Sequence, residues 1–145
     1  MGIPARVSLV TIGARDMAAQ RAFYAALGWE EHAGSDDRWA AFRTGGAILA
    51  LFPMTGLAED AHVPPEDPPG FRGVTLAANV EQPELVDEAI ETARKAGATI
   101  TKEAEQAFWG GRSGCFRDPE GNVWEVAWMP NATFDAGGAL QMPEG

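Results

Sequence analysis

Residues 116–125 read Phe116-Arg-Asp-Pro-Glu-Gly-Asn-Val-Trp-Glu125, and this stretch decides how the second half of the chain folds. Its centre, Asp118-Pro-Glu-Gly121, has the composition of a tight turn, because aspartate, proline and glycine each favour turn conformations. Runs of β-branched and aromatic residues on both sides are typical of strands. The stretch therefore predicts two strands, Ser113–Arg117 and Asn122–Trp128, joined by this turn.

The residues upstream extend this pattern into a complete unit. Phe71–Val80 has the composition of a strand, and Pro83 suits the first position of a helix. Apolar residues then recur at helical spacing up to Gly97, which is placed to end the helix. A further strand, Thr99–Glu103, precedes the two strands around the turn, so the predicted order is βαβββ.

The first half of the chain repeats the same plan. Val7–Ile12 is a β-branched run that predicts a strand, and Asp16 is placed to cap a helix over Met17–Leu27. Gly28 can close that helix in the left-handed conformation. Three short strands are predicted next, again in the order βαβββ: Trp29–Ala33, Arg38–Arg43 and Ala47–Phe52.

This internal repeat predicts an α+β fold in one domain over residues 1–145. The first module spans residues 6–53 and the second spans 71–128, with a proline-rich crossing at 54–70 and a polar tail at 129–145. Two tandem βαβββ modules with curved mixed sheets would enclose a cleft for a small ligand. The alternative is an α+β domain without a functional cleft.

Composition narrows the classes of partner. The chain has 145 residues, of which 46% are hydrophobic, and 21 acidic against 11 basic residues give a formal charge of -10. A field of that sign repels nucleic acid and anionic lipid, so neither is expected as a partner. No stretch approaches the ~20 apolar residues of a membrane span, and no signal peptide opens the chain, so the expected location is cytoplasmic.

Four segments of this sequence carry a resemblance to a known family. They are Val10-Thr-Ile-Gly-Ala-Arg-Asp16, Arg21-Ala-Phe-Tyr24, Leu27-Gly-Trp29 and the stretch 116–125. Over about residues 6–128 the chain resembles the vicinal oxygen chelate superfamily, which contains glyoxalases, bleomycin resistance proteins and extradiol dioxygenases. Residues 108–114 are similar to an uncharacterised, glyoxalase-like branch. The resemblance implies the paired-module fold and a homodimer.

The resemblance also locates where a metal ion would bind. Metal-dependent relatives place ligands on the first and fourth strands of each module, and the matching residues here are Leu9, Ala50, Val74 and Glu125. Only Glu125 offers a ligand atom, and one carboxylate cannot replace three or four protein ligands. We therefore expect no metal and no cofactor, and neither glyoxalase I activity nor extradiol ring cleavage.

Glu125 is the candidate catalytic residue. Strand alternation around it puts Val123, Glu125 and Ala127 on the cleft face and their neighbours on the helix-packed face. A carboxylate in a partly apolar cleft is a candidate ligand anchor or general base. The alternative is a structural ion pair with Arg112 or Arg43.

The candidate ligand-binding residues combine apolar walls with a few polar anchors. Phe52 has the strand parity of Ala50, and Trp109 precedes a flexible pair of glycines that could lay its indole over a ligand. For each aromatic side chain the alternative is an ordinary core position. The full candidate set is Leu9, Ile48, Phe52, Val74, Leu76, Phe108, Trp109, Arg112 and Glu125.

Three functions remain open on these residues. The leading hypothesis is a metal-independent protein that binds a small organic molecule in the cleft. The second is a lyase or isomerase of the same superfamily with Glu125 as general base, so whether the chain is an enzyme stays open. The third is an interaction scaffold with a vestigial cleft. A homodimer is expected as well, because the strands 7–12 and 122–128 carry almost no charge and suit covered positions.

Overall fold

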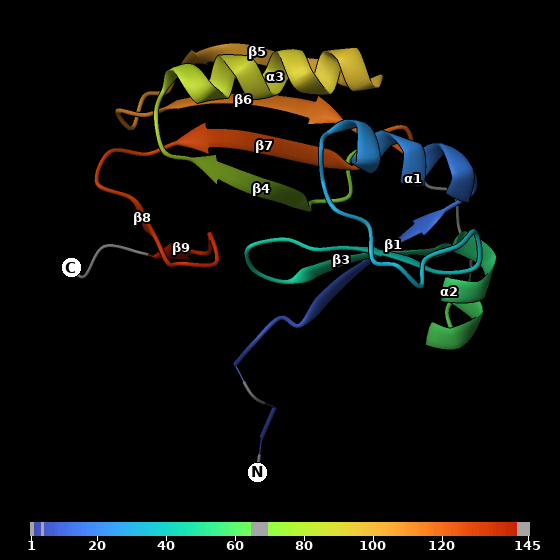
Figure 1. The fold of residues 1–145 in the computed structure, drawn as a ribbon. Helices are drawn as coiled ribbons and strands as arrows, with labels where there is room; N and C mark the ends of the chain where they lie inside the picture. The colour runs from blue at the N-terminus through green and yellow to red at the C-terminus, as the bar shows by residue number, and fades with distance from the viewer. Residues whose placement is uncertain (1, 4, 65–69, 142–145) are drawn as a thin grey trace.

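The computed structural model describes residues 2–3, 5–64 and 70–141, and it is an α+β fold of two separate sheets with helices packed on them (Figure 1). The first sheet has the order β1-β3-β2, in which β1 and β3 are parallel. Its elements are β1 (Leu9–Ala14), α1 (Met17–Ala26), β2 (Ala40–Phe42) and β3 (Ile48–Pro53). No helix in the described part of the chain is long and apolar enough to cross a membrane.

The second sheet repeats this arrangement. Its order is β4-β7-β6-β5, so the first strand again lies beside the last and parallel to it. The elements of this module are β4 (Thr75–Val80), α3 (Glu84–Ala96), β5 (Thr99–Gln106), β6 (Arg112–Arg117) and β7 (Val123–Trp128). The predicted fold class is confirmed, and the second module has the predicted order βαβββ.

Three local predictions differ from the structure. The strand expected at 29–33 is reduced to one bridge between Glu31 and Phe42, because the following segment forms turns of its own. There the Asp36 carboxylate accepts hydrogen bonds from the backbone N–H groups of Arg38 and Trp39, at 2.7 and 3.2 Å.

The expected crossing begins with a helix, α2 (Met54–Ala61), because its four prolines start only at Pro64. The tail contains a short hairpin of β8 (Thr133–Phe134) and β9 (Leu140–Gln141). Residues 65–69 of the crossing and 142–145 of the tail lie outside the described residues.

Helix termini follow the sequence signals. The Asp16 carboxylate caps α1 by accepting a hydrogen bond of 3.0 Å from the backbone N–H of Ala19. Gly97 ends α3 with φ of +105°, a conformation that glycine adopts without a steric penalty. The turn at 118–121 is confirmed too, by a hydrogen bond of 2.9 Å from the Gly121 N–H to the Asp118 carbonyl.

One hydrophobic core joins the two modules. Phe23 and Tyr24 on α1 reach across to Phe116 on β6 and Trp124 on β7, with ring centroids 6.2 Å apart in both the Phe23–Phe116 and the Tyr24–Trp124 pair. Ile90 on α3 packs on the same side of the second sheet, against Gly114. The modules therefore pack through their helix-bearing faces, and the opposite sheet faces point away from this core.

Candidate functional site

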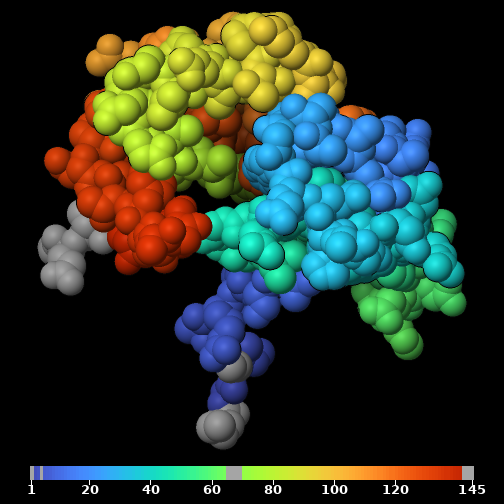
Figure 2. Space-filling model, in the orientation of Figure 1, coloured from blue at the N-terminus to red at the C-terminus, as the bar shows by residue number. Residues whose placement is uncertain are grey.

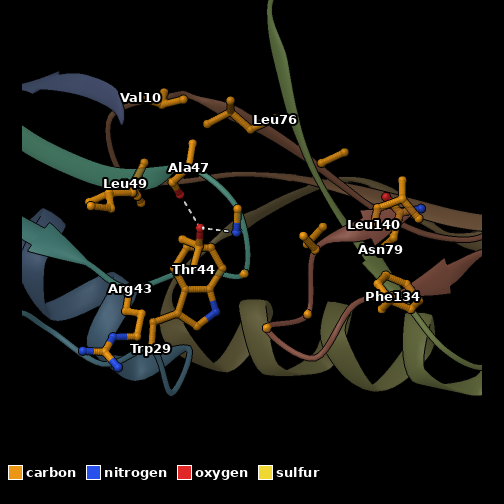
Figure 3. Close-up of a pocket in the computed structure, with 18 of the residues that line it drawn as sticks. Val10, Trp29, Arg43, Thr44, Ala47, Leu49, Leu76, Asn79, Phe134 and Leu140 are labelled. Atoms are coloured by element: carbon orange, nitrogen blue, oxygen red, sulfur yellow. Dashed lines mark hydrogen bonds between the residues drawn. The ribbon is translucent and has the colours of Figure 1, made fainter. Parts of the chain in front are cut away.

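A cavity of about 850 Å³ lies between the two modules. Val10 and Leu49 line it from the first sheet, Leu76 and Ala78 line it from β4, and Trp124 lines it from β7. Figure 3 shows Val10 and Leu76 together on one side and Trp29 across from them. Since ligand cavities usually measure about 300–1,000 Å³, this one has room for a small organic molecule.

Two turns form the remaining wall. One is the β2–β3 turn, residues 43–47, and the other is the tail hairpin, residues 133–141, whose Phe134 and Leu140 line the cavity. The turns touch closely, because a Cβ placed on Gly45 would lie 2.8 Å from the carbonyl carbon and oxygen of Gly138. Figure 2 shows the surface of the tail meeting that of the first module below β4.

Polar side chains are few in this cavity. The Thr44 hydroxyl is already engaged, because it donates to the Ala47 carbonyl and accepts from the Gly46 N–H at 3.2 Å. Arg43 is the charged residue of the lining, and Figure 3 shows its guanidinium turned away from the wall that Asn79 and Phe134 form. The Asn79 carboxamide has no hydrogen bond to any residue in the described ranges. The cavity wall is therefore mostly apolar, and within the described residues Asn79 and Arg43 are its polar side chains without a hydrogen bond.

The structure places the predicted ligand-binding residues in several different environments. Ile48 and Leu76 line the cavity. The other seven lie outside its wall, so their contact with a ligand stays a prediction: Leu9, Phe52, Val74, Phe108, Trp109, Arg112 and Glu125. The cause is the packing of the modules, which puts the cavity beside Trp124, whereas its neighbour Glu125 lies on the opposite face of the sheet.

Glu125 is half-buried on that opposite face. Ala77 on β4 and Cys115 on β6 flank it in register, and its carboxylate has no hydrogen bond or ion pair within the described segments. Burial raises the pKa of the Cys115 thiol; the Lys102 ammonium opposes this rise and the Glu125 carboxylate adds to it. Lys102 Nζ donates a hydrogen bond of 2.7 Å to Ser113 Oγ on the neighbouring strand.

Arg112, one of the ion-pair partners considered for Glu125, pairs with a different carboxylate. Arg112 makes a bidentate contact with Asp87 on α3, with both nitrogen–oxygen distances at 2.7 Å. This contact raises the pKa of Arg112 and lowers the pKa of Asp87. Arg112 lies on the same face of its sheet as Trp124 and α3, whereas Glu125 lies on the other face, and this parity explains why the Arg112 side chain reaches the helix rather than Glu125.

The aromatic candidates lie at the surface or against local backbone. Phe108 is fully exposed, and Trp109, 43% exposed, lies over Gly111, where an added Cβ would meet its ring. Phe52 packs against Gly56 of α2 in the same manner. Among the other aromatic side chains, Phe42 and Trp124 are buried in the core, whereas Trp39 is 37% exposed.

The residues at the metal positions of the family do not fit a metal ion. In the first sheet Thr11 pairs with Ala50, two residues after Leu9, and in the second sheet Ala77 pairs with Glu125. The equivalent of Leu9 is thus Thr75, one residue later than the predicted Val74, which precedes β4. Leu9 and Ala50 have no donor atom, and within the described ranges no group of three His, Cys, Asp or Glu side chains is close enough to hold a metal.

The principal wall residues missed from the sequence are Trp29, Trp124 and Asn79. Trp29 was assigned to a strand, and Trp124, a neighbour of Glu125, was assigned to the helix-packed face of its strand. Their indole rings meet edge to face with centroids 5.4 Å apart at the end of the cavity. The sequence did contain a signal for both tryptophans, because Trp29 lies in the segment 27–29 and Trp124 in the stretch 116–125, and both segments carry the family resemblance.

Comparisons with known proteins agree on the family. The family model described as Glyoxalase/Bleomycin resistance protein/Dioxygenase superfamily matches residues 6–126. A glyoxalase-related enzyme from Fulvimarina pelagi is similar in structure, with 28% identity, a TM-score of 0.87, and 97% of this chain and 99% of that chain covered. None of the curated proteins matches the sequence significantly.

Two further solved structures show the same fold. A glyoxalase/bleomycin resistance protein/dioxygenase family enzyme from Burkholderia phytofirmans PsJN is 25% identical, with a TM-score of 0.76 over 86% of this chain and 98% of that one. A lactoylglutathione lyase from Agrobacterium tumefaciens is 23% identical, with a TM-score of 0.66 over 87% and 95%, a likeness of fold alone. The chain belongs to the Glyoxalase/Bleomycin resistance protein/Dioxygenase superfamily.

Proposed function

We propose that this member of the Glyoxalase/Bleomycin resistance protein/Dioxygenase superfamily binds a small organic molecule between its modules without a metal ion. The observation that carries the proposal is the cavity of about 850 Å³, whose walls are apolar and include the indoles of Trp29 and Trp124. Burial of apolar ligand surface there contributes roughly 25 cal/mol per Å². Aromatic walls favour a ligand that contains a ring.

Metal independence is supported by the chemistry of the side chains. Leu9 and Ala50 stand at two of the family positions, and neither Val74 nor Thr75 adds the imidazole or carboxylate that such a site needs. Glu125 alone is too few ligands. The binding we propose therefore depends on shape and apolar contact rather than on coordination.

A thermal-shift screen against metabolites and antibiotics, with and without divalent cations, tests this function. A ligand that binds only the folded state raises Tm by mass action, and we expect such hits to be unchanged by EDTA. Ala47→Trp fills the cavity from the β2–β3 turn and should abolish the shifts. Ala22→Trp, on the exposed face of α1, is the matched control and should retain them. Shifts that survive in Ala47→Trp would place binding elsewhere and contradict the proposal.

One observation favours a second candidate, a lyase or isomerase. Glu125 is half-buried on an accessible face, and its carboxylate has no partner within the described residues, so it is free to accept a proton. The similar protein from Fulvimarina pelagi is described as a glyoxalase-related enzyme. Turnover that is lost in Glu125→Gln while ligand binding persists would support this candidate, and unchanged turnover would reject it.

We further propose a homodimer formed through the sheet faces that point away from the core. Apolar side chains are exposed in and just before β1 and just before β4, among them Val7, Leu9, Phe71 and Val74. Contiguous exposed apolar surface often marks an association site, and we propose that these residues belong to one. Light scattering should give twice 15.4 kDa, and Leu9→Lys should shift the mass toward one chain. A mass of 15.4 kDa for the native chain would refute the dimer.

A further inference from the structure

The way β4 borders the cavity indicates which chemistry the cavity recognises. Leu76, Ala77, Ala78 and Asn79 all line it, although alternate residues of a strand point to opposite faces. A wall that takes four consecutive residues from one strand is formed by the strand's backbone edge. β4 is an edge strand of its sheet and pairs only with β7. The edge that borders the cavity is therefore the free edge of β4.

That edge carries unused hydrogen-bonding groups. Alternate residues of a parallel edge strand direct their N–H and C=O away from the sheet, so residues 76–79 present about two donors and two acceptors. In the described part of the chain no backbone hydrogen bond is made to this side of β4. The Asn79 carboxamide adds one further donor and acceptor of the same type.

The side chains that face this edge are apolar. Val10 and Leu49 face it from the first sheet, and Phe134 and Leu140 face it from the tail. Arg43 also lines the cavity, but its guanidinium points away from the wall that Asn79 and Phe134 form (Figure 3), so the side of the cavity along β4 carries no charged group. A charged group held against these apolar side chains would give up hydration without an opposite charge beside it.

We propose that the cavity selects an uncharged molecule that carries secondary amide groups, which pair with the free edge of β4 as a neighbouring strand would. This inference rests on the proposed binding function and adds the class of ligand. A flat amide ring with apolar substituents matches both features, because its N–H and C=O groups meet the strand edge while its substituents contact the apolar walls. Amide pairing with a sheet edge is an established mode of recognition for extended peptides.

Three probes of related size test this proposal. The cyclic dipeptide cyclo(Leu-Phe) presents two secondary amides, its N,N′-dimethyl derivative lacks both donors, and linear Leu-Phe carries two charges. Calorimetric titration should show cyclo(Leu-Phe) binding at least tenfold more tightly than the dimethyl derivative, because removing donors leaves buried carbonyl groups unpaired. Linear Leu-Phe should not bind measurably. In an amide NMR spectrum, those N–H groups of residues 76–79 that point to the free edge should become protected from exchange with cyclo(Leu-Phe) only.

The outcomes separate this inference from the binding function itself. Equal affinity for cyclo(Leu-Phe) and its dimethyl derivative would overturn the amide pairing and leave the cavity as a binding site. Binding of the neutral aromatic amine N-phenyl-1-naphthylamine without binding of cyclo(Leu-Phe) would also overturn the amide pairing while leaving the cavity as a binding site. If none of these probes binds, and the screen above yields no hits, the proposed function fails too. Tight binding of cyclo(Leu-Phe) that persists in Ala47→Trp would also overturn the inference, because the probe would then bind outside the cavity.

Discussion

The Tyr24 hydroxyl donates a hydrogen bond of 2.6 Å to Asp118 Oδ2, and so joins two residues that lie 94 positions apart in the chain. Tyr24 belongs to α1 of the first module, and Asp118 belongs to the turn between β6 and β7 of the second. The same hydroxyl accepts a hydrogen bond of 2.9 Å from Trp124 Nε1, and Gln20 Nε2 donates to Asp118 Oδ2 at 2.9 Å. A buried polar network therefore fixes how the two modules pack.

Tyr24→Phe should destabilise the fold without changing its shape. Asp118 keeps its bonds from Gln20 and Asn122, but the buried N–H of Trp124 loses its acceptor. Leaving such a donor unpaired costs about 1–3 kcal/mol, which urea denaturation would resolve. The control is Thr92→Val, which removes an exposed hydroxyl from α3 and should change the free energy of unfolding by less than about 0.5 kcal/mol. Equal effects in the two variants would argue against the network.

Alkaline pH should reveal the same network in the native protein. Burial, the Asp118 carboxylate and their hydrogen bond raise the pKa of Tyr24 above its ordinary value. Below pH about 10 both the folded and the unfolded chain keep this proton, and the stabilising contribution is complete. Above it only the unfolded chain loses the proton, so the free energy of unfolding falls by about 1.4 kcal/mol per pH unit from this group. The fall should be absent from Tyr24→Phe.

Absorbance gives a direct check of this titration, since Tyr24 is the one tyrosine of the chain. Tyrosinate absorbance should appear only when the protein unfolds, as monitored by circular dichroism. Tyrosinate that forms near pH 10 in the folded protein would show that the hydroxyl is accessible and the network open.

The fold could be predicted from sequence because its signals are local. The Asp118–Gly121 turn, the Asp16 cap and Gly97 each fix a chain direction through their own backbone preferences, and each is where the sequence placed it. The strand expected at 29–33 does not form, and the spacing of apolar residues gives no sign of the cause. The Asp36 side chain satisfies neighbouring backbone N–H groups that a strand would need.

The site was harder to predict because it depends on how the modules pack. Strand alternation correctly separates Glu125 from Trp124, but it does not say which sheet face meets the other module. That choice is made by Phe23 and Tyr24, whose contacts with Phe116 and Trp124 cross between the modules. Ile48 and Leu76 were identified by sequence reasoning, whereas the tail hairpin could not be found from a segment with no periodicity.

Metal removal should have no effect on this protein. We expect less than one zinc, nickel, iron or manganese ion per chain after dialysis, and an unchanged Tm in EDTA, because Leu9 and Ala50 offer no ligand atoms. Elemental analysis and thermal denaturation check this. A stoichiometric metal, or a Tm that falls on chelation, would contradict the side-chain argument and reopen the metal-dependent reactions of the superfamily.

The contact between the tail and the β2–β3 turn should control entry to the cavity. Gly45→Ala places a methyl group 2.8 Å from the Gly138 backbone, closer than Cβ atoms approach in proteins, so the tail hairpin must move. Gly46→Ala is a matched control in the same turn, because nothing lies within 4 Å of its added methyl group. Both glycines have ordinary backbone angles, so neither change strains the turn itself.

We expect Gly45→Ala to expose the tail to proteolysis and to speed the release of a cavity ligand several-fold, with little change in Tm, since the displaced hairpin lies outside the shared core. Stopped-flow tryptophan fluorescence measures the release, and Trp29 and Trp124 are placed to report it. Gly46→Ala should match the native chain in both assays. If the two variants release ligand at the same rate, the tail hairpin is a passive wall and the ligand enters by another route.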